Sequence, residues 1–110
     1  MSGLTTHVLD ATRGAPAAGI RVELRRGDGA ALADPEGRTD ADGRARLGPA
    51  ALEPGSYTLT FHTGEFFAAR GSDTFYPRVD VVFSVPEPAA DHYHVPLLLS
   101  PFAYSTYRGS

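Results

Sequence analysis

Apolar and polar residues alternate over short stretches of this chain, and helical periodicity is almost absent. Alternation with a period of two is typical of strands that bury one face, especially between Gly, Pro and Asp clusters. The pattern predicts strands over residues 4–10, 19–26, 43–47, 56–62, 78–85, 91–99 and 103–109, with a weaker strand near 30–33. Many short strands at close intervals favour an all-β sandwich or barrel.

Turn-forming residues stand between these strands. Glycine closes the segments RGDG at 26–29 and DADG at 40–43, where it supplies the positive φ angle that other residues resist. The Arg-Gly-Asp of the first segment also matches an adhesion tripeptide, but its place in a turn favours a structural interpretation. One short helix is predicted at 64–71, with Gly71 ending it.

The second faces of three predicted strands are neither plainly core nor plainly solvent-exposed. On the strands 4–10, 91–99 and 103–109 these faces mix histidines with apolar and hydroxyl side chains, namely His7, Leu9, His94, Pro96, Leu98, Ser105 and Tyr107. Half-apolar faces with a few polar groups indicate an interface or a pocket. Because proline lacks the N–H that a ladder needs, Pro96 predicts a sheet edge or a bulge at that point.

Length and composition limit what such a protein can do. The 110 residues predict one domain, residues 1–110, with enough chain for one core. The absence of cysteine excludes thiol catalysis, and because all ten basic residues are arginines, a lysine Schiff base is excluded too. The net charge of −3 is dispersed, unlike the basic stripe of a nucleic-acid surface. The chain shows no signal-peptide or membrane-spanning pattern, so a cytoplasmic location is expected.

The histidines on the mixed face are the strongest candidates for chemistry. Imidazole titrates near neutral pH, so His7 and His94 could together hold a water molecule and move its proton. Two alternatives stay open: a zinc site formed by His7, His92 and His94, and a purely structural role for these side chains. A catalytic triad through Ser105 or Ser110 is weaker, since no nucleophile-elbow motif is present. These residues indicate a hydrolytic face but name no substrate.

Three segments carry a family resemblance: LTTHVLDATRGAPAAGI at 4–20, TDADGR at 39–44 and HYHVPLLLSPFAYSTYRGS at 92–110. They closely resemble the transthyretin-like 5-hydroxyisourate hydrolases over essentially the whole chain. Transthyretin itself shares the scaffold and the Leu-Leu-Ser-Pro segment, but it has neither the histidines nor the Tyr-Arg-Gly-Ser tail. The resemblance implies a transthyretin-like β-sandwich of two four-stranded sheets with one short helix. It also implies a homotetramer, a dimer of dimers, with active sites in a channel between the dimers.

The resemblance implies roles for individual residues as well. The family's catalytic residues match His7, Arg44 and His94, and His92 falls near the channel rim. The family's tail motif matches Tyr107, Arg108, Gly109 and Ser110. If four chains pack their mixed faces together, this tail is buried, and Ser110 with its terminal carboxylate can line a site.

The implied reaction is a step of urate breakdown, the hydrolysis of 5-hydroxyisourate to 2-oxo-4-hydroxy-4-carboxy-5-ureidoimidazoline. In this scheme His7 and His94 activate water, Arg44 holds the developing oxyanion, and Tyr107 and Ser110 shape the pocket. The resemblance implies no cofactor and no metal.

Two further functions are compatible with a sandwich of this kind. One is a transthyretin-like carrier of small aromatic ligands, and the other is a module whose histidine face binds a protein partner. A secreted carrier should have a signal peptide and a channel free of catalytic groups, and a binding module gives no reason for the Tyr-Arg-Gly-Ser tail. The sequence therefore favours the hydrolase, with the carrier as the alternative.

Overall fold

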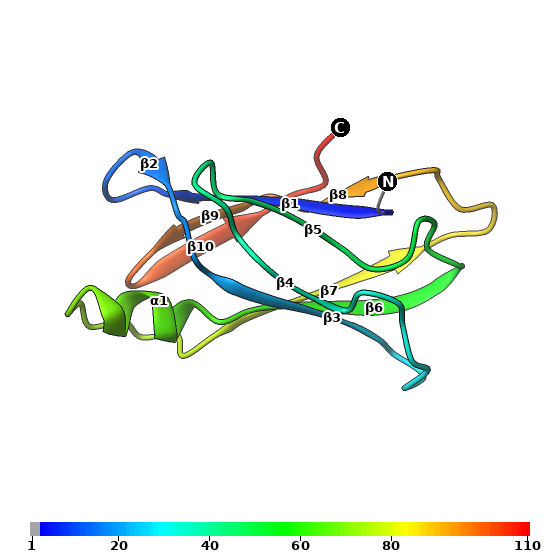
Figure 1. Cartoon of the computed structure of the whole chain (residues 1–110), viewed down its shortest axis with the longest axis horizontal. Helices are drawn as coiled ribbons and strands as arrows, with labels where there is room; N and C mark the ends of the chain where they lie inside the picture. Colours follow the sequence, from blue (N-terminus) through cyan, green and yellow to red (C-terminus); the bar gives the residue numbers. More distant parts are fainter. Residues whose placement is uncertain (1–2) are drawn as a thin grey trace.

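Two β-sheets packed face to face make up the structure, a computed structural model that describes residues 3–110 (Figure 1). One sheet is antiparallel throughout and lies at the bottom of the view in Figure 1. In sheet order its strands are β4 (Glu36–Arg38), β3 (Arg21–Arg26), β6 (Gly55–Phe61) and β7 (Val79–Val85).

The other sheet is built around β1 (Leu4–Asp10). On one side β1 pairs antiparallel with β5 (Arg44–Leu47) and, further along, with β2 (Ala15–Pro16). On the other side it pairs in parallel with β8 (Tyr93–His94) and then β9 (Leu97–Ser100), and β9 pairs with β10 (Ala103–Thr106). Since β5 and β2 share one side of β1, and β8 and β9 share the other, this sheet is four strands wide. The predicted sandwich of two four-stranded sheets is thereby confirmed.

Alternation along the strands explains how the two sheets hold together. In β1 the residues Leu4, Thr6 and Val8 are buried, while their neighbours are only partly buried. Tyr57 and Leu59 of β6 face them in the same core and are almost fully buried. Each large apolar side chain removed from water in this way stabilises the fold by about 1.5–3 kcal/mol.

The helix α1 (Thr63–Ala69) follows β6 and buries Phe66 and Phe67. Gly71 adopts a left-handed conformation (φ 66°), and its N–H donates to the Ala68 carbonyl at 3.1 Å. The next N–H, that of Ser72, donates to the Phe67 carbonyl at 3.0 Å. This is a Schellman ending, so the predicted short helix and its glycine terminator are both confirmed. Within the described residues, no helix has the length and apolar character needed to cross a membrane.

Some predicted strand boundaries are wrong. Residues 30–33 form no strand, because they belong to the loop that joins β3 to β4. There the Ala30 N–H donates to the Asp28 carboxylate at 2.9 Å, and the partner strand of β3 begins only at Glu36. The short strands β2 and β4 were not predicted, since two or three residues give no periodic pattern.

The strand predicted over 91–99 is interrupted at Pro96 and forms two strands, β8 and β9. Pro96 does not lie at a sheet edge, because the ladder runs between β1 on one side and β10 on the other. Its carbonyl oxygen accepts a hydrogen bond from the Thr106 hydroxyl at 2.7 Å, beyond which β10 ends. The final strand is therefore shorter than the predicted 103–109.

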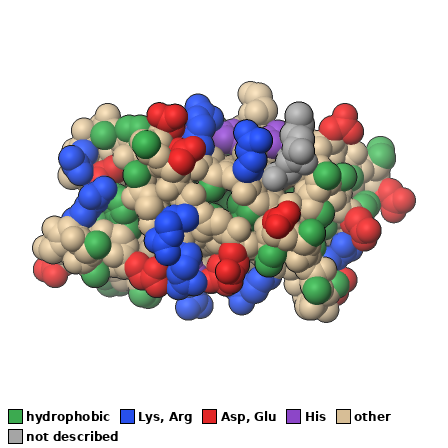
Figure 2. All heavy atoms as spheres, in the orientation of Figure 1, with side chains coloured by type: hydrophobic (Ala, Val, Ile, Leu, Met, Phe, Trp, Pro, Cys, Tyr) green, Lys and Arg blue, Asp and Glu red, His purple; other side chains and the backbone are tan. Residues whose placement is uncertain are grey.

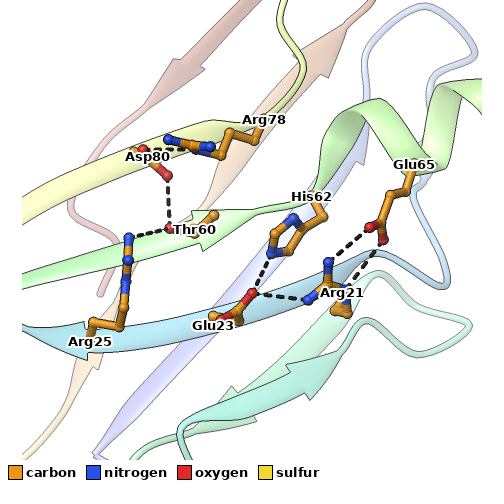
Figure 3. A network of polar contacts seen from close by, with 8 residues as sticks. All are labelled: Arg21, Glu23, Arg25, Thr60, His62, Glu65, Arg78 and Asp80. Carbon is orange, nitrogen blue, oxygen red and sulfur yellow. Dashed lines mark hydrogen bonds and ion pairs between the residues drawn. The ribbon is translucent and has the colours of Figure 1, made fainter.

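A network of polar contacts crosses the antiparallel sheet and reaches α1 (Figure 3). Arg21 donates to Glu65 at 2.8 Å and to Glu23 at 3.0 Å, and Glu23 also pairs with His62. Further along, the Thr60 hydroxyl donates to Asp80 at 2.7 Å and accepts a hydrogen bond from Arg25 at 3.4 Å (Figure 3). These groups lie on the antiparallel sheet and at the start of α1, away from the sheet of the predicted catalytic residues, so they offer matched controls for the experiments below.

Candidate active site

Two neighbouring rows of residues cross the sheet on the face that the sequence predicts to be mixed. In the first row, Arg46 of β5 and His94 of β8 are the Cα partners of Thr5 of β1. In the second row, Arg44 is the Cα partner of His7. In Figure 2 histidine side chains reach the surface beside basic ones, in the part of the view where Figure 1 places β1, β5 and β8. The register thus brings two arginines and two histidines onto one face.

The tail beyond β10 continues along the same rows. The pairing of β9 with β10, extended past Thr106, sets Gly109 opposite His94, and the Gly109 N–H donates to the His94 carbonyl at 2.9 Å. A Cβ at Gly109 would clash with Cδ2 of the His94 ring. Only glycine therefore lets the tail approach the ring this closely.

The DADG turn positions Arg44. Its first residue, Asp40, accepts hydrogen bonds on one carboxylate oxygen from the N–H groups of Asp42 (2.9 Å) and Arg44 (3.0 Å). The Arg44 hydrogen bond is the main cause that lowers the pKa of the Asp40 carboxyl, so this side chain stays ionised. Gly43 has a φ of 77°, and a Cβ there would clash with the Val8 carbonyl oxygen. Only glycine at this position therefore lets the turn pack this closely against β1.

Thr5 joins the two histidines of the HYH segment. Its hydroxyl oxygen lies 2.8 Å from Nδ1 of His94 and 2.9 Å from Nε2 of His92. Both distances are those of hydrogen bonds, and both pairs are partly buried. The two rings are therefore held by a single hydroxyl group.

The environment of His94 favours its neutral form. Burial lowers the pKa of His94 below its ordinary value, and the charges of Arg44, His92 and His7 lower it further. A neutral imidazole at physiological pH can accept a proton, as a general base must.

A cavity of about 510 Å³ opens over these rows. It is lined by Thr5, Thr6, Arg38, Asp40, Arg44, Ala45, Arg46, His92, His94 and Ser110. Its side chains include three arginines and one carboxylate, that of Asp40, so positive charge dominates among the lining side chains. Forked arginine donors in such a setting suit a planar, electron-rich ligand.

The predicted site residues divide between this cavity and a smaller hollow. Arg44, His94 and Ser110 line the cavity, as does His92. Tyr107 and Arg108 instead line a hollow of about 240 Å³, and the Arg108 guanidinium lies 5.1 Å from the centre of the Tyr93 ring. His94 borders both spaces, and Gly109 contacts its ring between them.

His7 contributes less directly to the cavity. Of residues 3–110, it is not among those lining the cavity. It lies across the strand pair from Arg44, and its charge acts on both His94 and Asp40. His7 therefore belongs to the electrostatic surroundings of the cavity.

Thr5, Arg38, Asp40 and Arg46 line the cavity without having been predicted from the sequence. A signal existed for two of them, since Thr5 shares a strand face with His7, and Arg46 shares one with Arg44. For the zinc alternative, no group of three potential metal ligands is found within residues 3–110.

The transthyretin-like sandwich and the cavity lined by histidine and arginine side chains together define the class of this protein. The chain belongs to the HIUase/Transthyretin family, whose model matches residues 4–109, and the predicted family is thereby confirmed. A Caulobacter vibrioides protein named 5-hydroxyisourate hydrolase is 50% identical over 117 residues, covering 100% of both chains.

Two solved structures show the same fold. The structure of Klebsiella pneumoniae 5-hydroxyisourate hydrolase has a TM-score of 0.85 at 40% identity, covering 100% of this chain and 94% of that one. Transthyretin from Sparus aurata also reaches a TM-score of 0.85, at 31% identity, covering 99% and 97% of the two chains. The fold alone therefore does not separate hydrolase from transthyretin, whereas the side chains of the cavity can.

Proposed function

We propose that this protein is a 5-hydroxyisourate hydrolase whose residues 1–110 act as one domain. The curated relatives bear that name or that of a uric acid degradation protein, and they confirm the predicted enzyme over the carrier alternative. The observation that carries the proposal is the meeting, in one cavity, of His94 with Arg44 and Arg46. A base of lowered pKa beside fixed cations is what hydrolysis of an amide-like bond requires.

His94 is the proposed base. In its neutral form it takes a proton from a water molecule, and the water oxygen forms a bond with the ring carbonyl carbon of 5-hydroxyisourate. The carbon–nitrogen bond of the six-membered ring then breaks, and a proton passes to the leaving nitrogen. The product is the ureidoimidazoline carboxylate.

Arg44 and Arg46 are the proposed anion binders. Both lie on β5 with one residue between them, so their side chains share a face of the sheet. As water attacks, negative charge develops on the carbonyl oxygen, and preorganised guanidinium groups stabilise it more strongly than they stabilise the neutral carbonyl. The same groups suit the carboxylate of the product.

His7 and the tail complete the proposed site. His7 acts with His94 in moving protons, and its position beside Arg44 supports this role. Ser110 closes the cavity, and Tyr107 with Arg108 supports the tail from the neighbouring hollow.

The direct test is a spectroscopic assay with freshly prepared 5-hydroxyisourate and purified protein, without added metal. Because the substrate decays unaided, the blank rate is subtracted. Hydrolysis well above the blank supports the proposal. An unchanged decay curve at micromolar protein would reject it, and loss of activity on chelation that zinc restores would revive the metal site.

The pH dependence of the reaction follows from the charge state of His94. Since the neutral ring is the base and its pKa lies below the ordinary 6.5, kcat/KM should stay level above pH 6.5 and fall only below it. Burial is the main cause of this lowering, and the charges of Arg44, His92 and His7 add to it. The measurement is blank-corrected kcat/KM from pH 5 to 8. A rate that rises as pH falls would mean that the protonated ring is the active form.

A His62→Ala variant is the matched control for this profile. His62 belongs to the polar network of the other sheet, where it pairs with Glu23. The inflection should therefore keep its position in this variant, whereas a shift would show that the titrating group is not the one assigned.

We further propose that the protein assembles as a homotetramer. Phe102 in the turn before β10, Tyr104 on β10 and Tyr107 in the tail are 66%, 41% and 58% exposed. Within residues 3–110 the strands β7 and β10 end their sheets. Exposed aromatics beside open strand edges are typical of surfaces that pair with another chain. Light scattering should give the mass of four 11.7 kDa chains. A monomer at micromolar concentration would contradict this, and the cytoplasmic location expected from the sequence stays a prediction for cell fractionation.

A further inference from the structure

A single hydroxyl group connects two imidazole rings of the cavity. Thr5 Oγ1 lies 2.8 Å from His94 Nδ1 and 2.9 Å from His92 Nε2. Thr5 is the Cα partner of His94, so the backbone pairing of β1 with β8 fixes this contact. All three residues line the cavity of about 510 Å³.

Hydrogen counting restricts how the three groups can bond. A threonine hydroxyl has one hydrogen to donate and lone pairs to accept with. When both rings are neutral and the hydroxyl donates to one of them, the other ring must donate to the hydroxyl. If His94 donates from Nδ1, the hydroxyl donates to Nε2 of His92, and both rings carry their proton on Nδ1. If the direction is reversed, both rings carry it on Nε2. The two rings therefore share one tautomer.

We propose that Thr5 is a positioning residue that makes His94 and His92 one proton-carrying unit, an inference that rests on the proposed hydrolysis. In the resting state both rings carry their proton on Nδ1, which leaves Nε2 of His94 free to take a proton from water. The Nδ1 proton of His94 then passes to Thr5 Oγ1, and the hydroxyl proton passes to Nε2 of His92. The positive charge now lies on His92, and the proton on Nε2 of His94 is ready for the leaving nitrogen. When that proton is transferred, the other two move back and both rings are neutral again.

The charged surroundings fit a His94 ring that is neutral before water is activated. Arg44 and Arg46 lie on β5, on one side of β1, and His7 lies on β1 itself. Arg38 lines the cavity as well, and Asp40 supplies an acidic side chain to the lining. Sharing one proton over two rings spreads the added charge that this cationic cavity would otherwise concentrate on His94.

The test compares Thr5→Val, which keeps the shape of the side chain without the hydroxyl, with Thr5→Ser, which keeps the hydroxyl. Thr5→Val should lower kcat by roughly tenfold to a hundredfold with KM changed by less than about threefold, because the lost step is proton movement and not binding. Thr5→Ser should restore most of kcat. Thr60→Val is the matched control, since it removes a hydroxyl that also bridges two side chains, on the other sheet. Full activity of Thr5→Val would overturn the proposal.

A double-mutant cycle and spectra of the two imidazole rings distinguish proton transfer through Thr5 from a purely structural role of its side chain. If Thr5 acts through His92, the Thr5→Val and His92→Ala losses should not add, and additive losses would contradict the link. Nitrogen-15 spectra should show the His92 and His94 rings in the same tautomer in the wild type and Thr5→Ser, and no longer matched in Thr5→Val. Opposite tautomers in the wild type would overturn the proposal.

These spectra need no substrate, so they test the link even if the wild type fails to hydrolyse 5-hydroxyisourate, an outcome that would reject the proposed function instead. If the thermal midpoint shows that Thr5→Val does not fold, wild type and Thr5→Ser still supply the spectral test.

Discussion

Replacing His94 with alanine is expected to lower kcat for 5-hydroxyisourate by roughly 10²–10⁴, the usual contribution of a positioned acid or base. The imidazole lines the cavity, is hydrogen-bonded at Nδ1 to Thr5, and has a pKa lowered by burial. The loss should appear in kcat more than in KM, because the ring acts on the proton of water while the arginines bind the substrate. Steady-state kinetics at pH 7.5, with spontaneous decay subtracted, measures both constants.

Alanine variants of the other histidines should lose kcat to different extents. His7→Ala should also cost at least about 10² in kcat, through its place beside Arg44. His92→Ala should cost less, since His92 acts only through Thr5 in the proposed relay. His62→Ala, at the start of α1, is the control and should leave kcat unchanged. A critical His92 with a silent His94 would show that the roles of the two rings have been assigned the wrong way round.

Much of the fold follows from residue alternation alone. The first strand has the predicted bounds, because Leu4, Thr6 and Val8 must all face the core for the strand to bury anything. The break at Pro96 shows the limit of such patterns. A missing N–H predicts a disturbance, but whether the strand lies at an edge or is interrupted in the middle depends on the strands paired on each side.

The site, too, follows only in part from the sequence. Periodicity places Thr5 and His7 on one strand face, and it cannot say which residue of another strand lies opposite each of them. The pairing of β1 with β8 makes Thr5 the neighbour of His94, and the pairing with β5 adds Arg46. Such register depends on contacts between distant segments, so the hydroxyl link and the second arginine emerge only from the folded chain.

For the tail, residues 107–110, the family motif says least about where each side chain lies. Four consecutive residues match one family motif, yet they separate in space, with Tyr107 and Arg108 at the smaller hollow and Ser110 at the cavity. The chain stays hydrogen-bonded to β8 after β10 has ended, through the Gly109 N–H and the His94 carbonyl, and Gly109 separates the residues at the hollow from Ser110 at the cavity.

Deleting residues 107–110 is accordingly expected to lower kcat by about 10² or more while leaving most of the stability. The ladder of β10 with β9 spans Ala103–Thr106 and remains intact. The deletion removes the Gly109 N–H hydrogen bond and the Arg108 guanidinium near the Tyr93 ring, together worth about 1–2 kcal/mol. It also strips the His94 ring of the backbone packed against it, and an error of about 1 Å in a catalytic group can cost a hundredfold.

A single substitution tests the position of the His94 ring while the rest of the tail is still present. In Gly109→Ala the new Cβ would clash with Cδ2 of His94, so the ring or the tail must shift and kcat should fall although every other tail residue is present. Gly64→Ala is the matched control, since a Cβ there also clashes, with the Pro77 carbonyl oxygen, but Gly64 lies in α1, away from the residues that line the cavity. Thermal midpoints, light scattering and kcat are measured for all three variants. If the truncated protein and Gly109→Ala both keep wild-type kcat, the tail does not hold His94, and its hydrogen bond to the His94 carbonyl serves only the sheet.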